Sequence, residues 1–473
     1  MAKASIDGNG LLPSNSLLGP PRLKSLPRRI AQILIPSFLS QNNSILAGEP
    51  VRPTDFLDGL RGYAAFIVFF GHFIIPAHPK AHTAYGGGHG HDDHWVTQLP
   101  ILRIFYSGQM CVFLFFVISG FSISLKPIKL ARKGQFAALF DALFSAIFRR
   151  ASRLYIPCVV VLFLSAILAC CGAFSYTYAL SEAWPFPGDP LPVPTIYNSA
   201  WTQLVDWARH MWVWADPLSG MVLPAHMPYG TQLWTIPVEL KCSLITWVAI
   251  LGTAKCTSTL RIGTISAMAV YFHLMKHPEA PLFLAGTIMA ELHCIRIEQN
   301  RNPPEESPGE KLRNAIIFIF GMMLGSYPRH GGRKALFFRW VHPVAKAIVG
   351  ESGKSPLFFS TSVAAVLMVW VVSKSASLQK LFTSSLARYL GKVSFALYCV
   401  HVAMITWFGY RNILFFWSIF GKEKVWQYEL GIGVAFVLQV VVTMWVADVF
   451  YRLVDLPSVR FTKWIEDKSV ASD

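Results

Sequence analysis

The chain alternates long apolar stretches with short polar segments. About 20 mostly apolar residues are needed for a helix that spans the hydrocarbon core of a bilayer, and windows of that kind recur throughout the sequence. We expect membrane helices near residues 57–76, 101–125, 154–174, 231–254, 260–275, 280–296, 313–328, 356–373, 393–410 and 429–451. The pattern therefore predicts an all-α integral membrane protein, a bundle of about 10 transmembrane helices.

Basic residues are distributed unevenly between the two ends of these helices. If both termini are cytosolic, the cytosolic segments hold about 28 of the 42 basic residues and the far-side loops hold about 13. Because cytosolic loops are enriched in Lys and Arg, this bias favours the assignment. The basic loop 329–354 on the far side runs against it, so either this loop binds something anionic or a helix is miscounted.

Polar segments divide the chain into three predicted regions. Residues 1–53 form a polar cytosolic N-terminal tail, residues 54–460 form the membrane domain, and residues 461–473 form a short cytosolic tail.

Composition excludes several other classes of protein. Of the 473 residues, 53% are hydrophobic and 14% are charged, whereas a soluble globular chain carries about 25% charged residues. The net charge of +16 would suggest nucleic-acid binding in a soluble protein. Here the basic residues lie between apolar stretches, where they face anionic lipid. The lipid bilayer, and no nucleic acid, is therefore the expected partner.

Metal and disulfide chemistry are also not expected. The eight cysteines contain no CxxC pair, so a zinc site is unsupported. The sequence GGGHGHDDH offers histidine and aspartate side chains, but no helix fixes them as ligands. We expect no metal site and no bound cofactor.

The first predicted helix, FLDGLRGYAAFIVFFGHF, carries a polar stripe. Asp58 and Arg61 are three residues apart and therefore neighbours on one helical face. His72 follows Arg61 by eleven residues, which places both on one face about 16 Å apart along the axis. Arginine suits phosphate groups, and histidine exchanges protons near neutral pH. The alternative is that Arg61 reaches the headgroups and His72 bonds a neighbouring helix.

Other ionisable or polar residues inside apolar windows are functional candidates, because charge within a bilayer is costly. The segment FRRASRLYIP places Arg149, Arg150 and Arg153 at the cytosolic start of a helix, where with Arg61 they could bind a polyphosphate or simply orient the chain. QLWTIPVELK contains Glu239, whose partner could be Lys241, an arginine or a histidine. SFALYCVH contains Tyr398 and His401, and FFVISGFSIS contains Ser119, for which plain helix packing is the alternative.

These segments together resemble the acyltransferase 3 family of multipass membrane acyltransferases. The resemblance covers about residues 54 to 460 and includes FLDGLRGYAAFIVFFGH, FFVISGFSIS, RRASRLYIP, QLWTIPVEL, SFALYCVH and RLVDLPSV in the family's order. The spacing of Arg61 and His72 is that of the family's arginine–ten residues–histidine motif. The polar N-terminal tail and long far-side loops are similar to those of fungal members.

The resemblance implies transfer of an acyl group, usually acetyl, from cytosolic acyl-CoA to a hydroxyl of a small metabolite, sugar or lipid. Its implied catalytic residues are His72, Glu239 and His401, with His72 as general base or acyl carrier. Its implied substrate-binding residues are Asp58, Arg61, Arg149, Arg150, Arg153, Ser119 and Tyr398. The protein would lie in an endomembrane or the plasma membrane. The segment 184–217, rich in proline and tryptophan, would select the acceptor or anchor the chain in the membrane. The rival prediction is a proton-coupled transporter of a small metabolite, in which the same ionisable residues relay protons.

Overall fold

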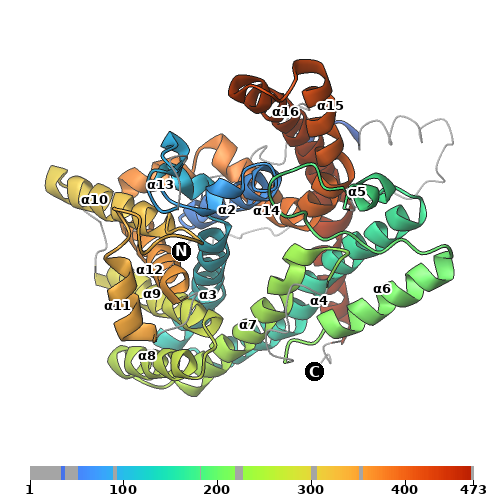
Figure 1. Ribbon diagram of the computed structural model, residues 1–473. Coiled ribbons are helices and arrows are strands. Elements are labelled where there is room, and N and C mark those ends of the chain that lie inside the picture. The colour runs from blue at the N-terminus through green and yellow to red at the C-terminus, as the bar shows by residue number, and fades with distance from the viewer. Residues whose placement is uncertain are drawn as a thin grey trace, which may run out of the picture. The chain divides into compact units, whose positions relative to one another are not determined.

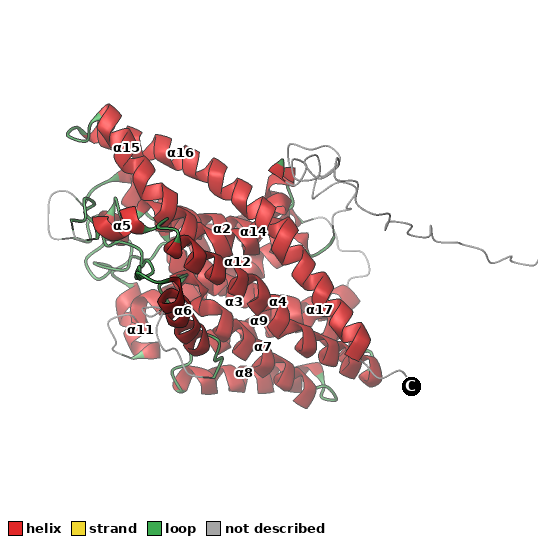
Figure 2. Cartoon of the chain, turned by 90° about the vertical axis from the view of Figure 1, so that its right-hand side faces the viewer, coloured by secondary structure: helices red, strands yellow, loops and turns green. Residues whose placement is uncertain are grey.

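Helices account for nearly all of the regular structure in the described part of the chain (Figures 1 and 2). The computed structural model describes residues 34–37, 52–88, 93–181, 183–218, 227–299, 306–350 and 355–469. Contacts divide the chain into the units Met1–Ser44 and Ile45–Asp473, and all of the helices discussed below belong to the second unit. Residues His89, His91 and Asp92 of the histidine-rich segment lie outside the described residues.

The helices follow one another with few long connections. In chain order the first are α2 (Asp55–Ile74), α3 (Gly108–Arg132), α4 (Phe136–Cys170), α5 (Ser175–Leu180), α6 (Ala200–Trp214), α7 (Thr235–Gly252), α8 (Ser258–Leu274) and α9 (Glu279–Gln299). They are followed by α10 (Pro308–Gly325), α11 (Val341–Val349), α12 (Ser355–Lys374), α13 (Ala376–Phe382), α14 (Ser385–Met404), α15 (Tyr410–Phe420), α16 (Val425–Phe450) and α17 (Leu456–Ser469). Short 3₁₀ segments are η3 (Pro79–His82), η4 (Val96–Gln98), η5 (Leu102–Tyr106) and η7 (Thr231–Trp234).

Two π-helical segments extend the last helices. The segment η8 (Ile405–Gly409) joins α14 to α15, and η9 (Tyr451–Asp455) joins α16 to α17. Figure 2 shows α16 continuing into α17 as one long rod. Because π-helical turns are frequent at functional sites, the side chains beside η8 and η9 are considered below with the site.

Each predicted membrane window contains a helix, which confirms the all-α fold of a multipass membrane protein. Among the described residues, 8 helices are long and apolar enough to cross a membrane. Two further predicted windows form α8, which has 17 residues, and α10, whose first two turns carry Glu310, Lys311 and Arg313. The number of helices that cross the membrane, the sides of the termini and the three region boundaries remain predictions.

Helix α4 is much longer than its predicted window at 154–174. It begins at Phe136 and has 35 residues, a length of about 52 Å at 1.5 Å per residue. This exceeds the roughly 30 Å hydrocarbon core. The predicted window does not include the first half of α4 because Asp141 and three arginines interrupt the apolar sequence there. Phe136, Phe140, Phe144 and Phe148 nevertheless recur at helical spacing in that half.

Glycine allows α3 and α9 to approach backbone to backbone. A Cβ at Gly120 of α3 would lie 2.1 Å from the carbonyl oxygen of Phe283, and a Cβ at Gly286 of α9 would lie 2.2 Å from that of Val117. Small residues promote this kind of close packing between membrane helices. One turn further along, the hydroxyls of Ser124 and Thr287 lie 2.9 Å apart.

We expect Gly120→Ala to destabilise the protein by about 1–3 kcal/mol, the usual cost of overpacking a close contact. The added methyl would push backbone against backbone, and no flexible side chain is there to yield. Gly263→Ala in α8 is the matched control, because a Cβ there meets nothing within 4 Å. Thermal unfolding midpoints in detergent should fall for Gly120→Ala and hold or rise for Gly263→Ala. Equal midpoints would contradict the packing described here.

The helices α2 and α14 pack in the same way. A Cβ at Gly62 of α2 would lie 2.4 Å from the backbone nitrogen of Gly391 in α14, and a Cβ at Gly391 would lie 2.5 Å from the carbonyl oxygen of Asp58. His72 lies on α2 and His401 lies on α14, and this close approach holds the two helices together. It therefore positions the candidate site.

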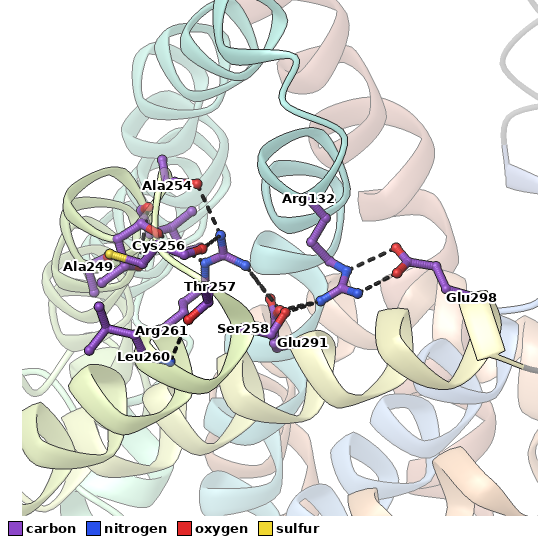
Figure 3. Close-up of polar contacts among 12 residues, drawn as sticks. Arg132, Ala249, Ala254, Cys256, Thr257, Ser258, Leu260, Arg261, Glu291 and Glu298 are labelled. Atoms are coloured by element: carbon purple, nitrogen blue, oxygen red, sulfur yellow. Dashed lines mark hydrogen bonds and ion pairs between the residues drawn. The ribbon is translucent and has the colours of Figure 1, made fainter.

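A buried ion-pair cluster ties the ends of α3, α8 and α9 together (Figure 3). Arg261 donates from Nη1 to both carboxylate oxygens of Glu291, at 3.0 and 2.9 Å, and its other nitrogens donate to backbone carbonyls that follow α7. Arg132 donates to Glu291 at 2.6 Å and also to Glu298. The side chains of Arg261 and Glu291 are 2% and 1% exposed, whereas that of Glu298 is 54% exposed.

We expect Glu291→Gln to destabilise the protein by about 3–5 kcal/mol, because removing one partner of a buried pair leaves a buried charge uncompensated. Two arginines lose their shared carboxylate in this variant. Glu298→Gln removes an exposed partner of the same Arg132 and should cost at most about 1 kcal/mol. Thermal or denaturant unfolding of both variants provides the measurement. Similar losses for the two variants would show that burial does not set the strength of this cluster.

Candidate active site

Two histidines from distant parts of the sequence meet between α2 and α14. Nδ1 of His72 lies 3.0 Å from Nε2 of His401. The two rings stack, with centroids 5.1 Å apart and planes inclined by 18°. His401 is fully buried, whereas His72 is partly exposed. The pair therefore runs from the protein interior toward an accessible face.

Hydrogen bonds assign the protons of this pair. Nδ1 of His401 lies 2.9 Å from the carbonyl oxygen of Tyr398 and 3.1 Å from that of Leu397. A carbonyl oxygen only accepts, so Nδ1 of His401 carries the proton and Nε2 of the neutral ring is an acceptor. His72 must then donate from Nδ1 to that Nε2. Nε2 of His72 is left with its lone pair, which is the arrangement of a general base.

Aromatic side chains surround the inner histidine. The rings of Phe69 and Tyr398 lie 6.3 and 5.9 Å from that of His401. The hydroxyl of Tyr398 donates to the carbonyl oxygen of Gln232 and lies 2.7 Å from the hydroxyl of Thr235. Tyr398 was predicted to bind substrate. In the structure its hydroxyl donates a hydrogen bond that joins α14 to η7. The aromatic rings, together with the two backbone carbonyl oxygens that accept from Nδ1, hold His401 in one orientation.

The intramembrane carboxylate of Glu239 has an arginine partner. Glu239 of α7 accepts from Nη2 of Arg150 at 2.7 Å and from the hydroxyl of Ser119 at 2.9 Å. Arg150 also donates from Nε to Ser243 at 3.2 Å. Of the three kinds of partner that the sequence allowed for Glu239, the structure shows an arginine. The contact joins α3, α4 and α7 at one point.

The predicted ion pair of the first helix is present. Nη2 of Arg61 lies 2.6 Å from the carboxylate of Asp58, which also accepts from Arg52 at 3.2 Å. The charges of Arg61 and Arg153 act on Arg150, so these three guanidinium groups share one region. The same two charges act on Asp455, in the π-helical segment η9. A positive cluster with carboxylates at its edge therefore lies near the N-terminal half of α2.

Arg149 does not point toward this cluster. Its Nε lies 3.0 Å from the carboxylate of Glu466 in α17 and 3.2 Å from the carbonyl oxygen of Ser145. The contact ties α4 to α17. Arg150, the next residue, points instead to Glu239.

Sequence reasoning missed Asp455 as a candidate site residue and missed the contact between His72 and His401. Asp455 lies in RLVDLPSV, a carboxylate directly after an apolar helix. That position is itself a signal, because carboxylates at membrane depth need partners. Nothing in the sequence pairs His72 with His401, since 329 residues separate them.

The helices and the polar groups between them define a multipass membrane protein with a histidine pair between α2 and α14 and an arginine cluster near the N-terminal half of α2. The sequence profile of an acyltransferase domain family matches residues 54–452. The chain belongs to this family, acyltransferase 3, and is a membrane acyltransferase. The match confirms the resemblance seen in the sequence motifs.

Curated relatives come from fungi and span nearly the whole chain. The O-acetyltransferase PaAT-1 of Phomopsis amygdali is 29% identical over 479 residues, which cover 93% of this chain and 92% of the relative. Acyltransferase R4 of a Phoma species is 25% identical, covering 87% and 95%. Acyltransferase clz18 of Cochliobolus lunatus is 26% identical, covering 85% and 94%. No solved structure matches this chain.

Proposed function

We propose that the protein transfers an acetyl group from acetyl-CoA to a hydroxyl of a small metabolite, sugar or lipid, with His72 as general base. The observation that carries this proposal is the contact between His72 and His401, because the carbonyl oxygen beside Nδ1 of His401 implies a proton order that leaves Nε2 of His72 as an unprotonated acceptor. The name of one relative, an O-acetyltransferase, supports the choice of acetyl and of oxygen as the attacked atom.

The chemical step follows from that lone pair. Nε2 of His72 takes the proton of the acceptor hydroxyl while the hydroxyl oxygen attacks the thioester carbonyl. The tetrahedral intermediate then expels the CoA thiolate, which takes the proton back from His72, so that the products are an ester and free CoA. His401 keeps Nδ1 of His72 protonated and stabilises the charge that His72 acquires. In the alternative mechanism, Nε2 of His72 itself attacks the thioester carbonyl and forms an acyl-histidine, from which the acyl group passes to the acceptor hydroxyl.

The arginine cluster is proposed to hold the phosphates of the donor. CoA carries several phosphate charges, and arginine presents donors in a planar fork that matches phosphate oxygens. Arg61, Arg150 and Arg153 are the proposed contacts. Asp58 and Glu239 would orient Arg61 and Arg150, with Ser119 supporting Glu239. The donor and its hydroxyl acceptor are the partners that this reaction needs, and it calls for no bound cofactor.

Arg61→Ala should raise the KM for acetyl-CoA by about 10-fold, with a smaller effect on kcat. This follows from loss of one charge-assisted contact to phosphate, worth about 1.5–3 kcal/mol. Arg149→Ala is the matched control, because Arg149 pairs with Glu466 on α17. Steady-state kinetics at varied acetyl-CoA separate the two variants. An Arg149→Ala variant with the larger KM would place the donor on the other side of α4.

The proposed function is tested with purified membranes, radiolabelled acetyl-CoA and an extract of small molecules, glycans and lipids. Wild-type membranes should form a labelled product and release one CoA for each label transferred. Isolation of that product identifies the acceptor. If longer acyl-CoAs give product and acetyl-CoA does not, the acetyl assignment is wrong while acyl transfer stands. If no acyl-CoA gives a product, the proposed function is wrong.

A further inference from the structure

A cavity of about 420 Å³ lies outside the site described above. Its walls come from the residues that follow α2, the segment between α10 and α11, and the start of α12. In the topology predicted from the sequence, all of these connections lie on the far side of the membrane. The volume falls within the range of small-molecule sites, about 300–1,000 Å³.

Positive charge dominates the lining. Arg329, Arg333 and Lys334 line the cavity together with His330 and His342, and its lining residues, all within the described part of the chain, include no carboxylate. Arg333 donates from Nε to Nδ1 of His342 at 3.3 Å. These residues belong to the loop whose positive charge runs against the general bias of far-side loops. A ligand of opposite charge gives that excess a physical reason.

Fixed contacts give the cavity a defined shape. Arg103 is buried and donates to the carbonyl oxygens of Ala81, Thr83 and Ser326, at 2.8 and 3.0 Å for the first two. The backbone nitrogen of His330 donates to the carbonyl oxygen of His82 at 3.0 Å. These bonds tie the segment after α2 to the segment after α10.

Glycine completes this junction. Gly331 has a φ of +74°, and a Cβ there would lie 2.1 Å from the carbonyl oxygen of Gly87. Glycine is suited to both the left-handed backbone and the close approach. Two walls of the cavity are thereby held in contact.

Cationic groups also lie near His82, at the junction between the segment after α2 and the segment after α10. Burial and then the charges of Arg329, His330 and Arg103 lower the pKa of His82 to about 4. Asp189 acts in the opposite sense. Burial alone disfavours the charged imidazolium, and the three neighbouring cations act in the same direction.

Part of the wall is apolar. Tyr327, Pro356 and Leu357 line the cavity together with the charged residues. A ligand that fills this space combines an anionic group with an apolar body, because an inorganic anion alone would leave the apolar wall uncovered.

We propose that this cavity is a binding site for an organic oxyanion, a phosphate or carboxylate attached to an apolar body, held by Arg329 and Arg333. The source of that oxyanion is either a phospholipid headgroup or a water-soluble molecule. The site does not depend on acyl transfer, and its test reads binding alone.

Binding is measured with the full chain in phosphatidylcholine nanodiscs. The soluble probes are 2-naphthyl phosphate, 2-naphthoate and uncharged 2-naphthol. The binding of each is measured by calorimetric titration. The lipid probe is phosphatidic acid, counted as bound adducts by native mass spectrometry. Binding of phosphatidic acid alone assigns the site to a lipid headgroup, and binding of a naphthyl anion assigns it to a soluble ligand.

The double variant Arg329→Ala/Arg333→Ala should weaken binding of the effective probe by at least 10-fold. Arg339→Ala removes an exposed charge of the same segment that does not line the cavity, and it should bind as wild type does. Arg329→Glu, a single change at an exposed position, should act in the same direction as the double variant if the latter folds poorly. The proposal is overturned if no anion binds the wild type, if 2-naphthol binds equally well, or if the cavity variants bind like Arg339→Ala.

Discussion

Replacing His72 with alanine is expected to lower kcat for acyl transfer by about 10²–10⁴-fold, the usual contribution of a general base. Nε2 of His72 is the one ring nitrogen of the pair that neither donates to nor accepts from the other groups described at the site. Without it, no group positioned by the pair removes the proton of the acceptor hydroxyl. Initial rates at saturating acetyl-CoA and acceptor give the measurement.

The fold should survive this substitution, because His72 is partly exposed and its bond to His401 is a single contact. His273→Ala, at an exposed histidine of α8, is the matched control and should retain full activity. Thermal unfolding midpoints of both variants check the fold. Full activity in a folded His72→Ala protein would remove His72 from the mechanism.

Replacing His401 should also lower kcat strongly, by about 10²-fold or more, because His401 fixes the tautomer of His72. In a Ser–His–Asp triad the loss of the group that fixes the histidine tautomer lowers kcat by about 10⁴-fold. The KM for acetyl-CoA should change little, since the arginine cluster does not include His401. His401 thus acts as a positioning residue whose effect appears in kcat.

Two variants of His401 separate positioning from packing. His401→Leu fills the buried space and accepts no hydrogen bond, whereas His401→Gln retains an amide oxygen that can accept from Nδ1 of His72. We expect His401→Gln to be at least 10-fold more active than His401→Leu, with the KM for acetyl-CoA within about twofold of wild type in both. Equal activity in the two variants would contradict a role for the hydrogen bond.

Local spacing predicted what lies within one helix. The pair of Asp58 and Arg61 is three residues apart, and its ion pair is present at 2.6 Å. The apolar windows likewise located the helices, because burial in a bilayer demands long apolar segments. The sequence could not show how far α4 extends beyond its apolar window, since charged residues interrupt the window without ending the helix.

Contacts between helices depend on how each helix is rotated about its axis, and spacing does not give that rotation. Arg149 and Arg150 are neighbours in the sequence and were both expected to bind the donor, yet Arg149 pairs with Glu466. Arg150 points to Glu239 instead. The pairing of His72 with His401 arises from the close packing of α2 and α14 at glycine residues, which only the assembled bundle reveals.

The central claim, that the chain catalyses acyl transfer and does not transport a metabolite, is tested most directly in sealed vesicles that contain the purified protein. Labelled acetyl-CoA and the isolated acceptor are added outside, and both compartments are analysed chemically. The account predicts an acetylated acceptor formed in equal amount to free CoA, and no product in vesicles that carry His72→Ala. Accumulation of chemically unchanged acceptor inside the vesicles, without CoA release, would contradict the account and establish transport.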